Sequence, residues 1–334
     1  MKRWLNLGAV TAVFIAFSLI VVKNAPGNVG QTLVNVSYDP TRELYASLNP
    51  LFAASYEKET GHRLAIVQSH GGSSRQAHRV ISGEQGADVV TLGMFSDVDA
   101  LRKRGLIAAN WADRLPNHSM PYTSTIVFVV RKGNPLHISD WPDLLAPGLE
   151  VVTPDPRTSG NGKLAALAAW AATTSRGGTD GAASAYLTAL YQHVKVLDEG
   201  ARGAATTFAV QEIGDVHLTW ENEALREVDA SKGRLQIVYP PVSILAEPYV
   251  AWVDREVARD GNLAAAKAYL NFLFSDSAQE TIARLGYRPS KGGAAFPPIT
   301  LVPVTSIARS WEDANEKFFA ENGIIDTIMG GRPR

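Results

Sequence analysis

The sequence contains no cysteine. This absence excludes disulfide bonds, thiolate nucleophiles and zinc–sulfur sites, and it excludes lipid attachment through an N-terminal cysteine. The sequence also lacks an excess of charge of one sign. Its 32 Lys and Arg residues are balanced by 33 Asp and Glu residues, giving a formal net charge of −1, and both signs are mixed along the chain. Because nucleic-acid-binding surfaces are basic patches or stripes, this balance argues against nucleic acid as a partner.

The first 25 residues have the form of an export signal. Lys2 and Arg3 precede an apolar run at residues 5–22, and a linker-like stretch follows at residues 23–28. A positive start before an apolar run is typical of secretory signal peptides. Because no small-x-small cleavage site is obvious and the run is long, a retained N-terminal membrane anchor is the alternative. Both interpretations of residues 1–25 predict that the rest of the chain is exported.

The remaining sequence is long enough for about two domains. With 334 residues, of which 46% are hydrophobic, the chain can bury substantial cores. Short apolar runs alternate with helical patterns, and the first three strands are predicted at residues 33–36, 64–68 and 87–92. A second series of the same kind follows the long β-branched run at residues 123–131. This alternation is typical of parallel α/β sheets, so we predict an α/β fold.

Five turns of small polar residues lie between a predicted strand and a predicted helix. They are at residues 37–39, 69–73, 158–161, 200–203 and 219–221. Helix N-termini carry free N–H groups and roughly +0.5 charge, and ligands of open α/β sheets bind at the carboxyl ends of the strands. Two lobes facing each other at these ends would hold a small anion with hydrogen-bond donors and no lysine. One such turn alone is equally consistent with an ordinary connection.

Residues 159–163, SGNGK, partly match a nucleotide-binding phosphate loop. The pattern G-x-x-x-x-G-K-[ST] requires glycine where this chain has Arg157, and Ser or Thr where it has Leu164. The match fails at both positions, so we reject nucleotide binding.

A hydrolase is the alternative from a different functional class. Asp39, His70 and Ser73 have the residue types of a catalytic triad, but no G-x-S-x-G elbow is present and such triples are common by chance. We therefore interpret His70 as a structural residue of its turn. Glu221 and Glu223 could be metal ligands, but carboxylates at a helix start more often interact with the helix dipole. We predict no catalytic site, no metal and no cofactor.

Eight segments in fixed order carry a family resemblance. They are YDPTRELY, QSHGGSSRQA, ADVVTLG, PYTSTIVFVVRKGNP, TSG before LAAW, EGARG, GDVHLTWENEAL and ILAEP. Together they closely resemble the periplasmic sulfate- and thiosulfate-binding proteins of ABC importers, from about residue 34 to residue 288. The resemblance implies a two-lobed, periplasmic-binding-protein-like (type II) α/β fold. In that fold, the lobes close about hinge crossovers over a dehydrated dianion in the cleft.

The predicted division into lobes follows from the long strand and from a later return segment. Residues 249–253 are predicted to begin this return, so the chain crosses between the lobes twice. We predict the first lobe at residues 31–122 plus 243–334 and the second at residues 123–242. We expect the protein to be a monomer.

The resemblance also implies sulfate donors, which are transferred only onto matching residues. The predicted donors are Asp39, Ser73, Ser159, Gly160, Asn161, Ala201 and Trp220. Ser73, Ser159 and Trp220 are expected to donate from their side chains. Ser73 also donates from its main-chain N–H, and the remaining four residues, Asp39, Gly160, Asn161 and Ala201, donate from their main-chain N–H groups only.

One stretch departs from the family pattern. The family turn usually has two successive glycines where this chain has Gly160 and Asn161, and the ARW that follows is replaced by residues 162–164, GKL. Asn161 keeps a main-chain amide, and Asn tolerates unusual φ better than most residues. Lys163 adds a charge that could tune anion affinity or face solvent.

The resemblance implies capture of sulfate, with thiosulfate as a second ligand, and delivery to an ABC permease from the periplasm without catalysis. A site of donors alone suits sulfate, because sulfate has no proton at neutral pH. Phosphate usually carries a proton and needs an acceptor such as a carboxylate. Asp39 is the one carboxylate that keeps phosphate open, and cavity size, which would separate molybdate, cannot be deduced from sequence. An ester hydrolase acting on sulfate or phosphate esters remains a further alternative.

Overall fold

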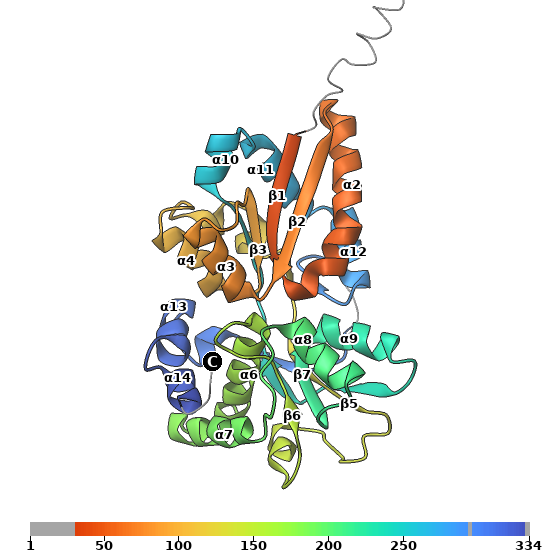
Figure 1. Ribbon diagram of the computed structural model, residues 1–334, viewed down its shortest axis with the longest axis vertical. Helices are drawn as coiled ribbons and strands as arrows, with labels where there is room; N and C mark the ends of the chain where they lie inside the picture. Colours follow the sequence, from red (N-terminus) through yellow and green to blue (C-terminus); the bar gives the residue numbers. More distant parts are fainter. Residues whose placement is uncertain (1–30, 293–295, 331–334) are drawn as a thin grey trace, which may run out of the picture.

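The computed structural model describes residues 31–292 and 296–330. These residues form two lobes, one above the other in Figure 1, each built on its own four-stranded sheet. The predicted two-lobed α/β fold is therefore confirmed. The predicted export signal at residues 1–25 lies outside the described residues. Within residues 31–292 and 296–330, no helix is long and apolar enough to cross a membrane.

The sheet of the first lobe has the strand order β10-β3-β1-β2. Its strands are β1 (Gln31–Tyr38), β2 (Leu64–Gly71), β3 (Val89–Leu92) and β10 (Tyr249–Trp252). β1 is parallel to β2 and β3, whereas β10 is antiparallel to β3. The carboxyl ends of β1 and β2 point toward the second lobe (Figure 1). The turns that follow these strands therefore lie on the side of the first lobe that faces the second.

Helices cover both faces of the first sheet (Figure 1). They are α2 (Arg42–Thr60), α3 (Ser73–Ser82), α4 (Phe95–Lys103), α10 (Asp254–Asp260), α11 (Leu263–Phe272) and α12 (Asp276–Arg284). Short turns η1 (Asp39–Thr41), η2 (Trp111–Asp113) and α5 (Pro116–Ser119) complete the lobe. The long α2 buries Leu44, Leu48 and Phe52, whose i, i+4, i+8 spacing places them on one face. It ends at Gly61, which adopts a left-handed φ of 74° that glycine tolerates.

The sheet of the second lobe has the strand order β6-β7-β5-β8. Its strands are β5 (Ile126–Arg131), β6 (Val151–Val152), β7 (Val216–Trp220) and β8 (Leu235–Val238). β6 is parallel to β7, but β5 is antiparallel to both β7 and β8. The strand–helix alternation predicted a parallel sheet, but this sheet is mixed, as is that of the first lobe. The chain enters this lobe along β5, which runs in the opposite direction to β7.

The second lobe is organised around α6 (Gly160–Thr174). Residues Gly160 to Ala172 of this helix are all buried, because its Ala- and Leu-rich surface is apolar on every side. Around it lie η3 (Trp141–Leu145), α7 (Asp180–Gln192), α8 (Ala201–Ala205), η4 (Thr206–Val210) and α9 (Glu221–Ala230).

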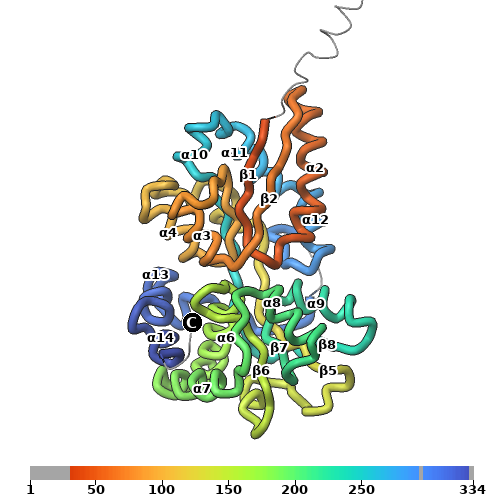
Figure 2. The backbone as a smooth tube through the Cα atoms, viewed as in Figure 1, coloured from red at the N-terminus to blue at the C-terminus, as the bar shows by residue number. Residues whose placement is uncertain are grey.

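Two of the segments that connect the lobes, residues 122–126 and 242–246, lie side by side, and the smooth trace in Figure 2 shows the connection. Ser124 and Ala246 exchange two main-chain hydrogen bonds of 2.9 Å. The Thr125 hydroxyl donates to the Ile244 carbonyl oxygen (2.8 Å), and the Ser243 hydroxyl donates to that of Ile126 (2.8 Å). Short strand pairs flank the crossing: β4 (Tyr122–Thr123) with β11 (Arg288–Pro289), and β9 (Val242–Ile244) with β12 (Thr300–Val302). These bonds join the two segments into one hinge.

The C-terminal elements are η5 (Val304–Ser306), α13 (Trp311–Ala314), η6 (Asn315–Phe319) and α14 (Ile324–Met329). η6 and α14 pack on the second lobe (Figures 1 and 2), whereas α13 contacts α4 of the first lobe. Phe318 packs edge-on against Trp170 of α6 at 4.9 Å, and α14 contacts α7. The predicted division, which places residues 243–334 wholly in the first lobe, therefore differs from the structure in this segment. The reason is that α6 and α7 need an apolar cover that the C-terminal aromatic residues supply.

Candidate functional site

Ser73 begins α3 at the edge of the first lobe that meets the second. β2 runs on to Gly71, so the connection predicted at residues 69–73 is reduced to Gly72. The first hydrogen bond of the helix is accepted by the Gly72 carbonyl oxygen (2.8 Å), so the Ser73 N–H has no acceptor within the helix. Ser73 is buried, and its Oγ accepts a hydrogen bond from the Gly93 N–H (3.0 Å). This bond leaves the Ser73 hydroxyl proton free to donate to a ligand.

The N-terminus of α6 carries three predicted donors. Ser159 is the N-cap, and Gly160 and Asn161 are the first two helical residues; all three are buried. The first intrahelical bond runs from the Lys163 N–H to the Ser159 carbonyl oxygen (3.0 Å). The main-chain N–H groups of Gly160 and Asn161 precede this bond and have no helical acceptor. The Ser159 side chain makes no capping bond, so its hydroxyl is not used by its own helix.

Asp39 and Ala201 lie opposite each other across the interface between the lobes. Asp39 follows β1, and Ala201 begins α8 after Gly200. A Cβ added to Gly200 would lie 2.7 Å from the Asp39 Oδ2 atom, so the two turns are in direct contact. The other oxygen of the Asp39 carboxylate accepts from the Arg42 guanidinium (2.8 Å). The Asp39 carboxylate is therefore paired with a cation of its own lobe.

Trp220 ends β7 and is fully buried. Its ring lies 5.3 Å from the ring of Tyr38, the last residue of β1, at an angle of 48°. Burial raises the pKa of Tyr38 well above its usual value, so its phenol stays neutral. The indole N–H of Trp220 is buried and has no hydrogen-bond partner among residues 31–292 and 296–330. A buried donor of this kind is costly unless a ligand accepts from it.

Close approaches across the interface bring the predicted donors of the two lobes together. A Cβ added to Gly160 would lie 3.2 Å from the Ser73 Cβ. A Cβ added to Gly72 would lie 2.7 Å from the Thr158 carbonyl oxygen and 3.2 Å from that of Glu199. The N-termini of α3, α6 and α8 thus meet at one place. The structure brings all seven predicted donors to this place, and their contact with a ligand stays a prediction.

Lys163 does not face solvent. Its Nζ atom lies 3.3 Å from Asp97 Oδ1 of the first lobe, and both side chains are more than nine-tenths buried. The Ser74 hydroxyl donates to the same oxygen (2.9 Å), and Nζ also lies 5.3 Å from the centre of the Phe319 ring. The ammonium is therefore neutralised by a carboxylate of the opposite lobe, and the anion site is lined by neutral donors.

Two further ion pairs join the lobes at the rim of the site. Arg75 of α3 pairs with Glu199, and Glu43 of α2 pairs with Arg202 of α8. Burial would raise the pKa of Glu43, but the Arg202 guanidinium reverses this effect and holds the pKa below its usual value. Arg202 also pairs with the buried Glu223 (2.9 Å). Burial raises the pKa of Glu223, although nearby arginines oppose the shift.

The residues considered for metal binding or catalysis have other partners. Glu221 accepts two hydrogen bonds from Arg288, at 2.6 and 2.9 Å. His70 lies in β2, with its Nδ1 atom 3.4 Å from the Tyr38 carbonyl oxygen, and burial lowers its pKa. In residues 31–292 and 296–330, no group of three or more His, Cys, Asp or Glu side chains is placed to hold a metal ion.

Sequence reasoning included Gly72 and Tyr38 in the turns at residues 69–73 and 37–39, but it missed Gly93. Gly93 allows close approach: a Cβ added there would lie 3.2 Å from the Tyr38 ring and 3.4 Å from the Trp220 ring. A signal for Gly93 was present, because it follows the predicted strand at residues 87–92 in the same way as the five turns. The contact between Tyr38 and Trp220 carried no signal, since the two residues are distant in the sequence.

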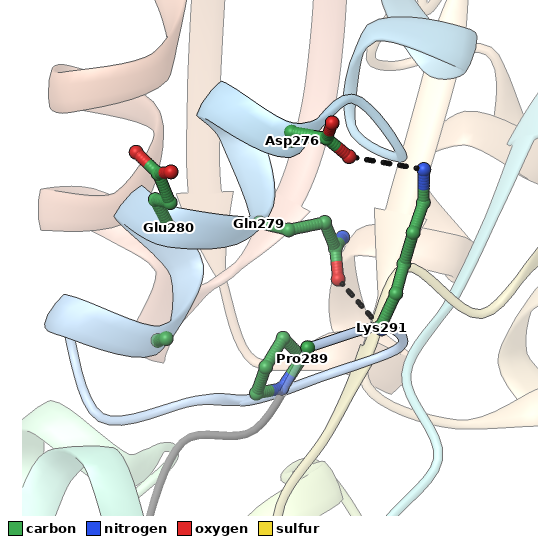
Figure 3. Close-up of a pocket in the computed structure, with 7 residues that line it drawn as sticks. Asp276, Gln279, Glu280, Pro289 and Lys291 are labelled. Atoms are coloured by element: carbon green, nitrogen blue, oxygen red, sulfur yellow. Dashed lines mark hydrogen bonds and ion pairs between the residues drawn. The ribbon is translucent and has the colours of Figure 1, made fainter.

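Two hollows lie outside this donor cluster. One, of about 800 Å³, borders the loop before α6 and is lined by Arg157, Lys163, Glu199, Phe319 and Asp326, among others. The other lies beside α12 (Figure 3), where Asp276 pairs with the Lys291 ammonium (3.4 Å) and Gln279 accepts from the Lys291 N–H (3.2 Å). Neither contains a predicted donor.

Comparison with known proteins agrees with this architecture. A family model described as bacterial extracellular solute-binding protein matches residues 41–288. The chain belongs to this family. This solute-binding protein is 45% identical to the sulfate-binding protein of Salmonella typhimurium over 336 residues, which cover 98% of this chain and 99% of the relative. It is 43% identical to the thiosulfate-binding protein of Pseudomonas aeruginosa over 306 residues, covering 89% of this chain and 92% of the relative.

A solved structure gives the same result for the fold of this solute-binding protein. The sulfate-binding protein SubI from Mycobacterium tuberculosis superposes with a TM-score of 0.79 at 31% sequence identity, covering 87% of this chain and 100% of SubI. The resemblance deduced from the eight sequence segments is confirmed by these relatives.

Proposed function

We propose that this protein captures sulfate, with thiosulfate as a second ligand, between its two lobes. The observation that carries the proposal is the convergence of donors from both lobes at one buried place. There, neutral N–H and O–H groups meet, and the ammonium of Lys163, two residues after Asn161, is paired with Asp97. The proposed donors are the main-chain N–H groups of five residues, two hydroxyls and one indole. They belong to Asp39, Ser73, Ser159, Gly160, Asn161, Ala201 and Trp220.

The expected affinity follows from the number of charged hydrogen bonds. Each contributes about 1.5–3 kcal/mol net, and association costs at least about 4 kcal/mol. Several such bonds therefore support a Kd of about 1 μM or lower. Because the ligand contacts both lobes, it has a higher affinity for the closed form, and lobe closure about the hinge is the functional event.

The excess of donors over acceptors among the proposed ligand groups favours sulfate over phosphate. Phosphate that carries a proton needs an acceptor in the site. The carboxylate of Asp39 is the one candidate acceptor, and its Oδ1 atom accepts from Arg42 of its own lobe. A site whose remaining groups are donors matches an anion that only accepts.

We further propose that the protein acts in the periplasm as a monomer and delivers its ligand to the permease of an ABC importer, without catalysing a reaction. The names of its relatives as sulfate- and thiosulfate-binding proteins support a transport role. His70, which was weighed as part of a catalytic triad, and Glu221, which was weighed as a metal ligand, are engaged in structural contacts. For residues 1–25, a cleaved signal peptide and a retained N-terminal anchor are the two predictions made above.

Calorimetric titration of the purified protein with sulfate, thiosulfate, phosphate and molybdate tests the ligand. We expect micromolar or tighter sulfate binding, weaker phosphate binding, and no hydrolysis of nitrophenyl sulfate or phosphate. Tighter binding of molybdate than of sulfate would reassign the ligand, and binding of none of the four would refute the proposal.

A further inference from the structure

The last residues of β7 have no neighbouring strand on one side. β6 has only two residues, whereas β7 has five, and the two are paired only at Val151–Val216 and Val152–His217. The Val216 N–H donates to the Glu150 carbonyl oxygen (3.3 Å). Main-chain groups alternate along a strand, so the N–H and C=O groups of Leu218 and Trp220 also point toward the β6 side of β7.

The main-chain N–H that would ordinarily donate to the Leu218 carbonyl oxygen is absent from this chain. In the register of this parallel ladder, the N–H of residue 154 would donate to the Leu218 carbonyl oxygen. Residue 154 is proline and has no N–H. The strand therefore needs another group at this point, since buried main-chain groups are almost always hydrogen-bonded.

The side chain of Asn161 supplies both missing partners. Its Nδ2 atom donates to the Leu218 carbonyl oxygen (3.0 Å), and its Oδ1 atom accepts from the Trp220 N–H (3.0 Å). One side-chain amide thus takes the place of the next main-chain peptide of β6. Asn161 is buried, so both bonds are shielded from water.

This arrangement holds the main chain of the residue whose indole N–H is a proposed ligand donor. The Trp220 ring is bounded on its other sides by the Tyr38 ring (5.3 Å) and by Gly93. With its main chain bonded to Asn161 and its ring packed, Trp220 has one direction in which its indole N–H points.

We propose that the Asn161 side chain is a positioning element that orients the Trp220 indole N–H for ligand binding. This role is separate from the main-chain donor already proposed for Asn161. It rests on the proposed function, because the ligand is the anion bound at that site. It also gives a physical reason for an asparagine where the family turn usually has glycine.

A double-mutant cycle with sulfate titrations tests the proposal. Trp220→Phe removes the indole donor and is expected to weaken sulfate binding about tenfold or more. Asn161→Gly keeps the main-chain N–H but removes the side chain, and we expect binding to weaken about three- to tenfold. In the Trp220→Phe background the same Asn161→Gly change should alter the Kd by less than about twofold, because the group that it positions is gone.

The matched control is Asn134→Gly. Asn134 makes the same two-way contact with a main chain, donating to the Ile138 carbonyl oxygen (2.7 Å) and accepting from the Ile138 N–H (3.0 Å), but it lies in the loop after β5. Its loss should lower the thermal midpoint and leave the sulfate Kd unchanged. If Asn161→Gly does not fold, Asn161→Ala gives the same comparison with a better helix former.

Indole N–H resonances provide a readout that a purely structural role would not change. The Trp220 signal, identified by its absence in Trp220→Phe, should shift on sulfate addition in the wild type and shift less in Asn161→Gly. Equal weakening by Asn161→Gly in both backgrounds, or an unchanged Kd, would overturn the positioning role while wild-type binding upholds the proposed function. Absence of wild-type sulfate binding would instead refute the proposed function.

Discussion

Replacing Gly72 by alanine should block closure of the lobes without disturbing either lobe alone. The φ and ψ of Gly72, −56° and 133°, are accessible to alanine, so the change introduces no backbone strain. The added Cβ would lie 2.7 Å from the Thr158 carbonyl oxygen and 3.2 Å from that of Glu199, both on the opposite lobe. The clash therefore exists only while the two lobes approach each other as they do in this structure.

The magnitude follows from the distances. An ordinary contact begins at 3.4 Å, so the lobes must separate by about 0.7 Å at this point. Hydrogen bonds to the ligand from one lobe, about 2.9 Å long, would then stretch to roughly 3.6 Å and cease to count as hydrogen bonds. Losing about two bonds to a charged ligand, each contributing about 1.5 kcal/mol or more, weakens binding by about 100-fold.

Calorimetry and small-angle scattering measure the outcome. We expect Gly72→Ala to show a sulfate Kd about 100-fold higher, an unchanged thermal midpoint without ligand, and a smaller decrease in radius of gyration on sulfate addition. Gly86→Ala is the matched control, because an added Cβ there meets nothing within 4 Å. Wild-type affinity in Gly72→Ala would refute the reasoning that closure around the ligand requires this contact.

Three other predictions address single groups. Ser73→Ala and Ser159→Ala should each weaken sulfate binding about tenfold in calorimetric titrations with thermal midpoints preserved, because each loses a hydrogen bond to a charged ligand; equal affinity would remove these assignments. Burial and the nearby Arg42 lower the pKa of His70 below its ordinary 6.5, so the unfolded chain binds its proton more readily. The free energy of unfolding, measured with urea, should therefore fall between pH 7 and pH 5, and His70→Asn should reduce that fall; an equal fall in both proteins would contradict this. Lys163→Met should speed ligand dissociation in stopped-flow experiments, because closure would then bury the Asp97 carboxylate without its cation; an unchanged rate would show that the pair does not hold the lobes together.

Much of the site could be predicted because its parts are local in sequence. Each turn joins an apolar strand to a helix pattern within a few residues, and such patterns fix where helix N-termini and their free amides occur. The eight longer segments in fixed order then carried the resemblance to the family. The exact ends of strands were less predictable: β2 extends to Gly71 because its pairing with β1 continues through Tyr38, which the local pattern does not contain.

The features that escaped prediction depend on partners far away in the chain. The bonds of Asn161 to Leu218 and Trp220 span 57 and 59 residues. The Lys163–Asp97 pair spans 66 residues, so the sequence left open whether this lysine faces solvent. The sequence of the C-terminal helices does not indicate the lobe on which they pack. An amphipathic pattern shows that one face of a helix is buried, but not which element covers it. The antiparallel entry of β5 is likewise a property of the hinge and not of the strand itself.

The interleaving of the chain has a consequence for how the protein reaches its native state. The first sheet is incomplete until β10 pairs with β3, and the buried Asn262–Asp88 bond beside it spans 174 residues. In the second lobe, α6 stays partly uncovered until residues 311–329 have been made and have packed against it. The first lobe therefore cannot complete its sheet before residue 252 has been made, nor the second lobe its core before residues 311–329 have been made, and such long-range contacts fold slowly. For a protein that we propose is exported, this order means that both lobes reach their native cores only after most of the chain is present.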